Sequence, residues 1–149
     1  MTAFEFAARS GRLPDLVLRY LDQEDWRNAR LRDGLQLAPR WWTGPVLLGL
    51  DRMVPCHGPG LEYDADPGTW ATVVEAYAAS LRSTAAAGPE RLPPLIVEYR
   101  EGELSIRDGG HGFATMRRLG WPAAWAVVWA NDPDDHGRVG TALRDDPRA

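Results

Sequence analysis

The sequence contains very little cysteine and no long apolar run. Cys56 is the single cysteine among 149 residues, so no disulfide can form within the chain, and we expect a cytoplasmic protein. Residues 1–12 lack the apolar core of a signal peptide. Because no stretch approaches the roughly 20 apolar residues of a membrane span, we also expect no membrane contact.

The chain also lacks an excess of positive charge. The chain carries 17 Lys and Arg against 21 Asp and Glu, a formal net charge of −4 at pH 7. A general nucleic-acid binder needs a basic surface that displaces counterions. The composition therefore argues against nucleic acid as a partner, although it is compatible with one local basic site.

The remaining composition is that of one compact domain. Hydrophobic residues make up 44% and charged residues 26% of the chain, which is typical of a globular core. Seven tryptophans are many for this length. They could fill the core or line a pocket, and composition does not decide between the two.

Apolar spacing predicts a mixture of helices and strands. Residues 14–34 follow a helical pattern with a break near Asp22, and residues 70–81 follow a clearer one after an Asp66-Pro67 start signal. Buried strands are predicted at 45–50, 95–99 and 123–129, and a further strand at 103–107. The dipeptide Glu101-Gly102 predicts a tight hairpin turn.

These elements predict an α+β fold with a small mixed sheet and flanking helices. We expect an N-terminal helical extension over residues 1–44 and the sheet domain over 45–130. The polar tail, residues 131–149, is expected to be either frayed or a short capping segment.

The segment "LSIRDGGHGFATMRRLGW" contains the most informative junction. A strand pattern ends at Asp108, two glycines follow, and a short helical pattern ends at Gly120. Such a junction can be a bare turn, because glycine adopts positive φ at no steric cost. It can also bind phosphate, because a helix N-terminus offers unpaired N–H groups and partial positive charge.

This segment resembles the ParB/sulfiredoxin-like superfamily, in which a β-hairpin leads through a glycine-containing turn into a helix. Many members carry Asp-Gly-x-His-Arg at the turn, an alanine in the helix and a glycine after it. The matching residues here are Asp108, Gly109, His111, Ala114 and Gly120. The resemblance extends over about residues 46–129 and implies a ParB/sulfiredoxin-like fold.

Departures from the family motif separate its members. Sulfiredoxins carry a cysteine where this chain has Gly110, and Cys56 lies far upstream. ParB partition proteins carry Gly-Glu-Arg-Arg, whose last three positions are here Gly110, His111 and Gly112. The segment is most similar to the free serine kinase-like members, although Gly112 replaces their arginine, which implies a weaker hold on phosphate.

The resemblance implies a nucleotide, ATP, ADP or CTP with Mg²⁺, whose phosphates lie over the turn. The residues expected to bind it are Asp108, Gly109, Gly110, His111 and Gly112. Asp108 is alternatively expected to cap the helix, and His111 either donates to phosphate or packs. Arg117 and Arg118 either replace the missing arginine or remain in solvent.

The candidate acid/base residues lie in the loop after the first strand. A kinase acting on a small alcohol needs a carboxylate that accepts the hydroxyl proton, and Glu62 and Asp64 are the candidates. His111 is a third catalytic candidate, and His57 is an alternative base. A solvated acidic loop is the competing interpretation. Trp70 and the pair Trp41-Trp42 could stack on a nucleobase or fill the core.

Two functions from different classes follow from these residues. The first is a nucleotide-binding enzyme, a phosphotransferase or nucleotide hydrolase acting on a small molecule. The second is a non-catalytic module of the same fold, binding a ligand or a protein through a degenerate site. The sequence does not identify the acceptor or any metal ligands.

Overall fold

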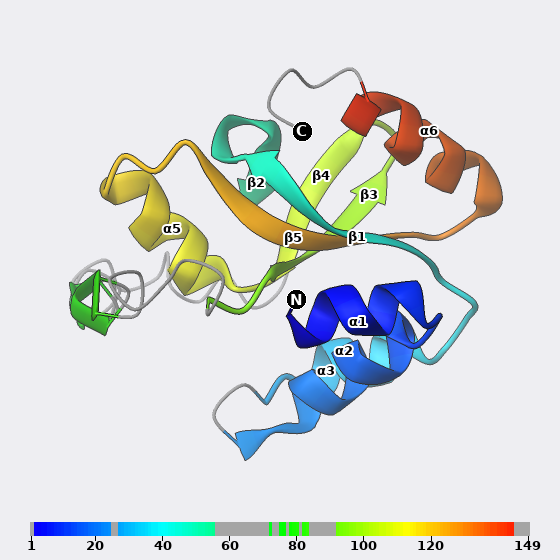
Figure 1. Ribbon diagram of the computed structural model, residues 1–149, viewed down its shortest axis with the longest axis horizontal. Helices are drawn as coiled ribbons and strands as arrows, with labels where there is room; N and C mark the ends of the chain where they lie inside the picture. The colour runs from blue at the N-terminus through cyan, green and yellow to red at the C-terminus, as the bar shows by residue number, and fades with distance from the viewer. Residues whose placement is uncertain are drawn as a thin grey trace.

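A computed structural model describes residues 2–24, 27–55, 72, 75–76, 78–80, 82–83 and 92–144. Its elements are, in chain order, α1 (Ala3–Arg9), α2 (Leu13–Asp22), α3 (Ala29–Leu35), β1 (Trp41–Gly49), a 3-10 turn (Leu50–Arg52), β2 (Met53–Pro55), β3 (Leu95–Arg100), β4 (Glu103–Asp108), α5 (Gly110–Arg118), β5 (Ala123–Ala130) and α6 (Pro133–Arg144). Figure 1 shows α1 to α3 on one side of the sheet, with α5 and α6 elsewhere around it.

The strands form one mixed sheet in the order β1-β5-β3-β4-β2. β3 runs parallel to β5, and β2 runs parallel to β4, whereas β1–β5 and β3–β4 are antiparallel. The α+β class with a small mixed sheet and flanking helices is therefore confirmed. β1 and β2 form the two edges.

The β3–β4 hairpin forms where the sequence predicts it. Glu101 and Gly102 both have positive φ, 51° and 86°, which is the backbone of a two-residue hairpin turn whose twist matches that of the strands. Leu104 and Ile106 are buried in one core, while Ser105 faces the opposite side of the sheet.

Each face of the sheet has its own apolar core. One core includes strand residues with Phe113 and Met116 of α5 and Val139 and Leu143 of α6. The other packs α2 and α3 against the opposite face through Ile96, Val127 and Trp129 of the sheet. The predicted N-terminal helices therefore cover one face, and α1 contributes the flanking residues Phe4 and Ala8.

The first strand differs from its prediction. It begins at Trp41, not at Pro45, and it lies at the sheet edge, so Leu47 is 37% exposed rather than buried. An apolar run predicts burial but does not say whether a strand has one neighbour or two. The boundary of the helical extension at residue 44 stays a prediction.

The tail is ordered where the sequence left two alternatives open. Residues 133–144 form α6, and Val139 and Leu143 anchor it to the core. This is a capping helix over residues 133–144, and residues 145–149 are not among those described. Within the described ranges, no helix combines the length and apolarity needed to cross a bilayer. The cytoplasmic location stays a prediction.

The predicted helix at 70–81 is described only in part. Thr72, Glu75, Ala76 and residues 78–80 are helical, and Ala78 is buried. Trp70 and Leu81 lie outside the described residues. The described positions agree with a helix that presents Ala78 to the interior.

Candidate functional site

Gly109 connects the end of β4 to the start of α5. Its φ is 93°, which side chains other than glycine rarely adopt. A Cβ at this position would stand 2.6 Å from Cδ2 of Leu95. Backbone geometry and close packing therefore require glycine here, whether or not a ligand binds.

The N-terminus of α5 has no side-chain cap. Gly109 occupies the capping position without a side-chain hydrogen bond, and the first helical backbone bond runs from the Phe113 N–H to the Gly109 carbonyl at 2.9 Å. Gly110 is exposed, and among the described residues, apart from its chain neighbours and its own helix backbone, no heavy atom lies within 4 Å of the place its Cβ would occupy. The helix start is thus open on the side of Gly110.

Asp108 does not cap α5, so that prediction is wrong. Its Oδ1 accepts a hydrogen bond from Nδ2 of Asn28 at 3.0 Å. Asn28 in turn caps α3, because its Oδ1 accepts from the Leu31 N–H at 3.1 Å. Asp108 therefore joins the N-terminal helices to the glycine junction. Burial raises the pKa of its carboxyl, and the Asn28 hydrogen bond partly opposes that shift.

Replacing Asp108 with asparagine is expected to raise the free energy of unfolding at pH 7. Above the ordinary pKa of 3.8, the unfolded state releases the proton before the folded state does, so stability falls as pH rises through that window. Asparagine keeps the acceptor oxygen for Asn28 and carries no charge. Urea denaturation of both proteins should show a gain at pH 7 that vanishes below pH 3.8. Glu103→Gln, at an exposed position of the same strand, is the control, and a gain that grows on acidification would contradict the expectation.

His111 lies in the first turn of α5 and is half-buried. Burial lowers its pKa below the ordinary 6.5, so the imidazole is mostly neutral at pH 7. Its carbonyl accepts a hydrogen bond from Oγ1 of Thr115 at 2.7 Å. A neutral imidazole can donate one hydrogen bond to phosphate or accept a proton, but it adds no positive charge.

Arg117 and Arg118, the two candidates for replacing the arginine missing at Gly112, both make other contacts. Gly112 itself is buried. The guanidinium of Arg117 lies over the Phe113 ring, 5.7 Å from its centre, and Arg118 forms an ion pair with Glu75. Both arginines are exposed, which agrees with the expectation that they remain in solvent, and their contacts are made at the surface.

The other predicted residues divide into two groups. Glu62, Asp64, His57 and Trp70 lie outside the described residues, so their roles stay predictions. Trp42 belongs to β1 and packs against Trp129, with ring centres 6.0 Å apart and planes inclined at 51°. That contact places Trp42 partly in the core beneath α1 to α3.

A polar groove that the sequence did not indicate lies where the parallel strands β3 and β5 end. Its volume is about 670 Å³. At its centre Glu98, on β3, has a side chain only 7% exposed. One carboxylate oxygen, Oε2, accepts from Nε of Arg107 at 2.9 Å and Nη2 at 2.7 Å. The other accepts from Nδ2 of Asn131 at 3.1 Å.

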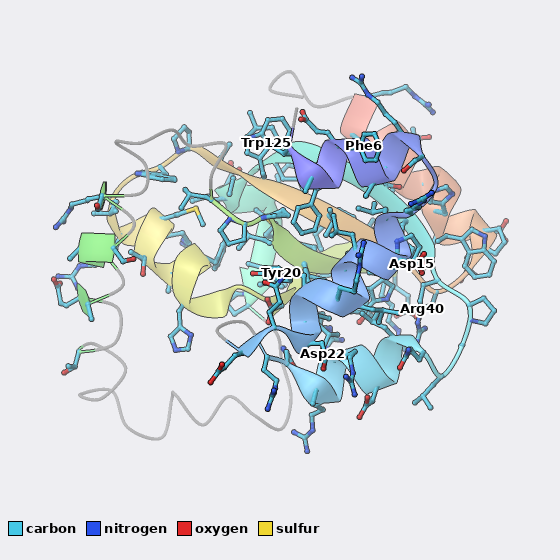
Figure 2. The ribbon with its side chains drawn as sticks, turned by 60° about the horizontal axis from the view of Figure 1, so that its bottom comes forward. Phe6, Asp15, Tyr20, Asp22, Arg40 and Trp125 are labelled. Atoms are coloured by element: carbon cyan, nitrogen blue, oxygen red, sulfur yellow. The ribbon has the colours of Figure 1, made fainter. Side chains whose placement is uncertain are left out.

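The same network reaches the N-terminal segment through Arg40. Its guanidinium donates to Oδ1 of Asn131 and to the Gly34 carbonyl at 3.0 Å. Arg40 precedes β1, after the loop that leaves α3 (Figure 2). The groove and the glycine junction share no residue, although Arg107 of the groove directly precedes Asp108 on β4.

Among the described residues, no group of three or more His, Cys, Asp or Glu side chains could hold a metal ion.

Comparisons with known proteins give one distant similarity. No family model matches the sequence, and no curated protein matches it. A solved structure of a Pnob8-like ParB-N domain shares 13% identity with a TM-score of 0.40, covering 70% of this chain and 36% of that one. The chain thus spans little more than a third of that protein. So distant a likeness identifies neither family nor function, and the superfamily resemblance rests on the junction motif.

Proposed function

We propose that this protein binds a nucleotide, with its phosphates at the N-terminus of α5 and Mg²⁺ bridging phosphate oxygens. The observation that supports the proposal is a helix start without a side-chain cap, with no close neighbour of Gly110 among the described residues beyond its own helix. The first N–H groups of a helix lack intrahelical acceptors, and the helix dipole adds partial positive charge there. A phosphate oxygen accepts hydrogen bonds from these N–H groups and carries the negative charge that the helix dipole favours.

The flanking side chains are compatible with an anion at this position. His111 supplies a neutral donor within the first turn. The raised pKa of Asp108 reduces the negative charge that this carboxyl would otherwise place near phosphate at mildly acidic pH. One of its carboxylate oxygens is also occupied by the hydrogen bond from Asn28, the capping residue of α3.

Phosphotransfer is the finer form of the proposal. Glu62 or Asp64 would accept the proton of a small-molecule hydroxyl, and His111 would contact the transferred phosphoryl group. In the non-catalytic alternative, the nucleotide or another ligand binds and is released unchanged. The absence of an arginine at position 112 is compatible with both the catalytic and the non-catalytic form, because each would bind phosphate with one charged donor fewer.

Gly110→Glu is expected to abolish nucleotide binding in a protein that still folds. Glutamate in the first helical turn interacts favourably with the helix dipole, so the helix should persist. Its side chain would occupy the open space and repel phosphate. Calorimetric titration with ATP, ADP and CTP in Mg²⁺ should show at least a tenfold loss of affinity, about 1.4 kcal/mol.

The matched control is Gly137→Glu, which adds the same charge at an open glycine in α6. Equal affinity in folded Gly110→Glu and in the unsubstituted protein would place the phosphates elsewhere. If nucleotide binds, release of phosphate in the presence of small alcohols separates the two forms. Loss of turnover with retained binding in Glu62→Gln or Asp64→Asn would support phosphotransfer.

A further inference from the structure

The groove at the ends of β3 and β5 contains two N–H donors without an acceptor among the described residues. They are Nε of Arg40 and Nε1 of Trp129, both shielded from solvent. Trp129 is only 4% exposed, and both residues line the groove. A buried donor without a partner costs about 1–3 kcal/mol, so two in one groove call for an explanation.

The two donors lie on the same face of the sheet. Trp129 is the register partner of Trp42 on one side and of Glu98 on the other. Arg40 is two residues before Trp42 and therefore diagonal to Trp129 along extended chain. Both donors belong to residues that line one groove, and because the two atoms are shielded from solvent, a ligand reaches them only when the side chains around them move aside.

The charges of the groove favour an anion beside Arg40. Glu98 already receives hydrogen bonds from Arg107 and Asn131. The two acceptors of Arg40, by contrast, are the neutral Asn131 amide oxygen and the Gly34 carbonyl. Its guanidinium is therefore a partly buried cation without a carboxylate partner among the described residues, an arrangement that is costly until an anion completes it.

We propose that this groove binds a small carboxylate ligand, with its oxygens accepting from Nε of Arg40 and Nε1 of Trp129. A carboxylate fits better than phosphate because four acidic side chains also line the groove and repel a dianion more than a monoanion; they are Glu98, Glu101, Asp132 and Asp135. The proposal is separate from the nucleotide proposed at α5, because none of the residues Asp108 to Gly112 lines the groove.

The test uses the indole N–H signals in a ¹H–¹⁵N NMR spectrum of the whole chain. Trp129→Phe identifies the Trp129 signal and keeps an aromatic ring against Trp42. Titration with sodium acetate and sodium succinate should move that signal downfield and saturate, because the indole N–H acquires an acceptor. Sodium chloride at matched ionic strength should leave it in place, and inorganic phosphate should act more weakly.

Two variants decide whether the groove is responsible. Arg40→Lys keeps the positive charge but removes Nε, and it should weaken acetate binding about tenfold or more. Trp125→Phe alters a tryptophan four positions earlier on the same strand that does not line the groove, and it should bind as the unsubstituted protein does. The proposal is overturned if carboxylates produce no saturable shift, if Arg40→Lys binds equally, or if phosphate binds more tightly than both carboxylates.

Discussion

Arg107→Ala is expected to destabilise the fold by about 2–4 kcal/mol, somewhat less than the roughly 3–5 kcal/mol for breaking a fully buried ion pair, because the Arg107 side chain is 31% exposed. The variant removes both arginine donors from Oε2 of Glu98. Glu98 then remains in the sheet as a buried carboxylate held by Asn131 alone. Such a group must lose its charge or admit water, and either outcome opposes folding.

Urea denaturation followed by circular dichroism measures this loss. Arg100→Ala is the matched control, because Arg100 is exposed at the end of β3 and its removal should change stability by no more than about 0.5 kcal/mol. A second variant, Glu98→Leu combined with Arg107→Ala, removes both charges and should recover much of the stability. Equal losses in Arg107→Ala and Arg100→Ala would show that the pair contributes nothing beyond a surface contact.

The predictions from sequence that are confirmed depend on local patterns. Leu104 and Ile106 alternate with polar residues, and Glu101-Gly102 between two strands leaves few backbone conformations other than a hairpin. The break near Asp22 and the helix after Gly109 were likewise predictable from capping and glycine signals. Each of these features is determined by residues within a few positions of one another.

The features that the sequence did not indicate depend on pairs far apart in the chain. The bond between Asn28 and Asp108 joins residues 80 positions apart, and Asp108 alone looks like an ordinary helix cap. The sequence likewise did not indicate the hydrogen-bond network of Glu98, since its partner Asn131 lies 33 positions away. One signal was present: a single acidic residue inside the apolar run "LIVEY" must find a partner if that strand is buried.

The β4–α5 junction shows why a motif does not by itself distinguish structure from function. Gly109 has a complete structural explanation in its positive φ and its contact with Leu95. Gly110 has none of this kind, because it is helical, exposed and free of close neighbours. Of these two adjacent glycines, only Gly110 lacks a structural explanation among the described residues, so ligand binding can explain the glycine only there. Substituting each glycine in turn separates the structural role from the ligand-binding role.

Gly109→Ala is expected to lower the free energy of unfolding by roughly 1–3 kcal/mol, the cost of holding a side-chain residue in a left-handed conformation. The new Cβ would also displace Cδ2 of Leu95, which belongs to the core beneath α5. Gly110→Ala should instead be neutral or stabilise the protein by up to about 1 kcal/mol, because alanine is the better helix former and meets nothing there. Thermal and urea denaturation of the two variants, which differ by one methyl group at adjacent positions, should therefore give opposite signs. Equal effects would mean that the chain at Gly109 can relax into an ordinary conformation, and that the strand-to-helix geometry does not depend on this glycine.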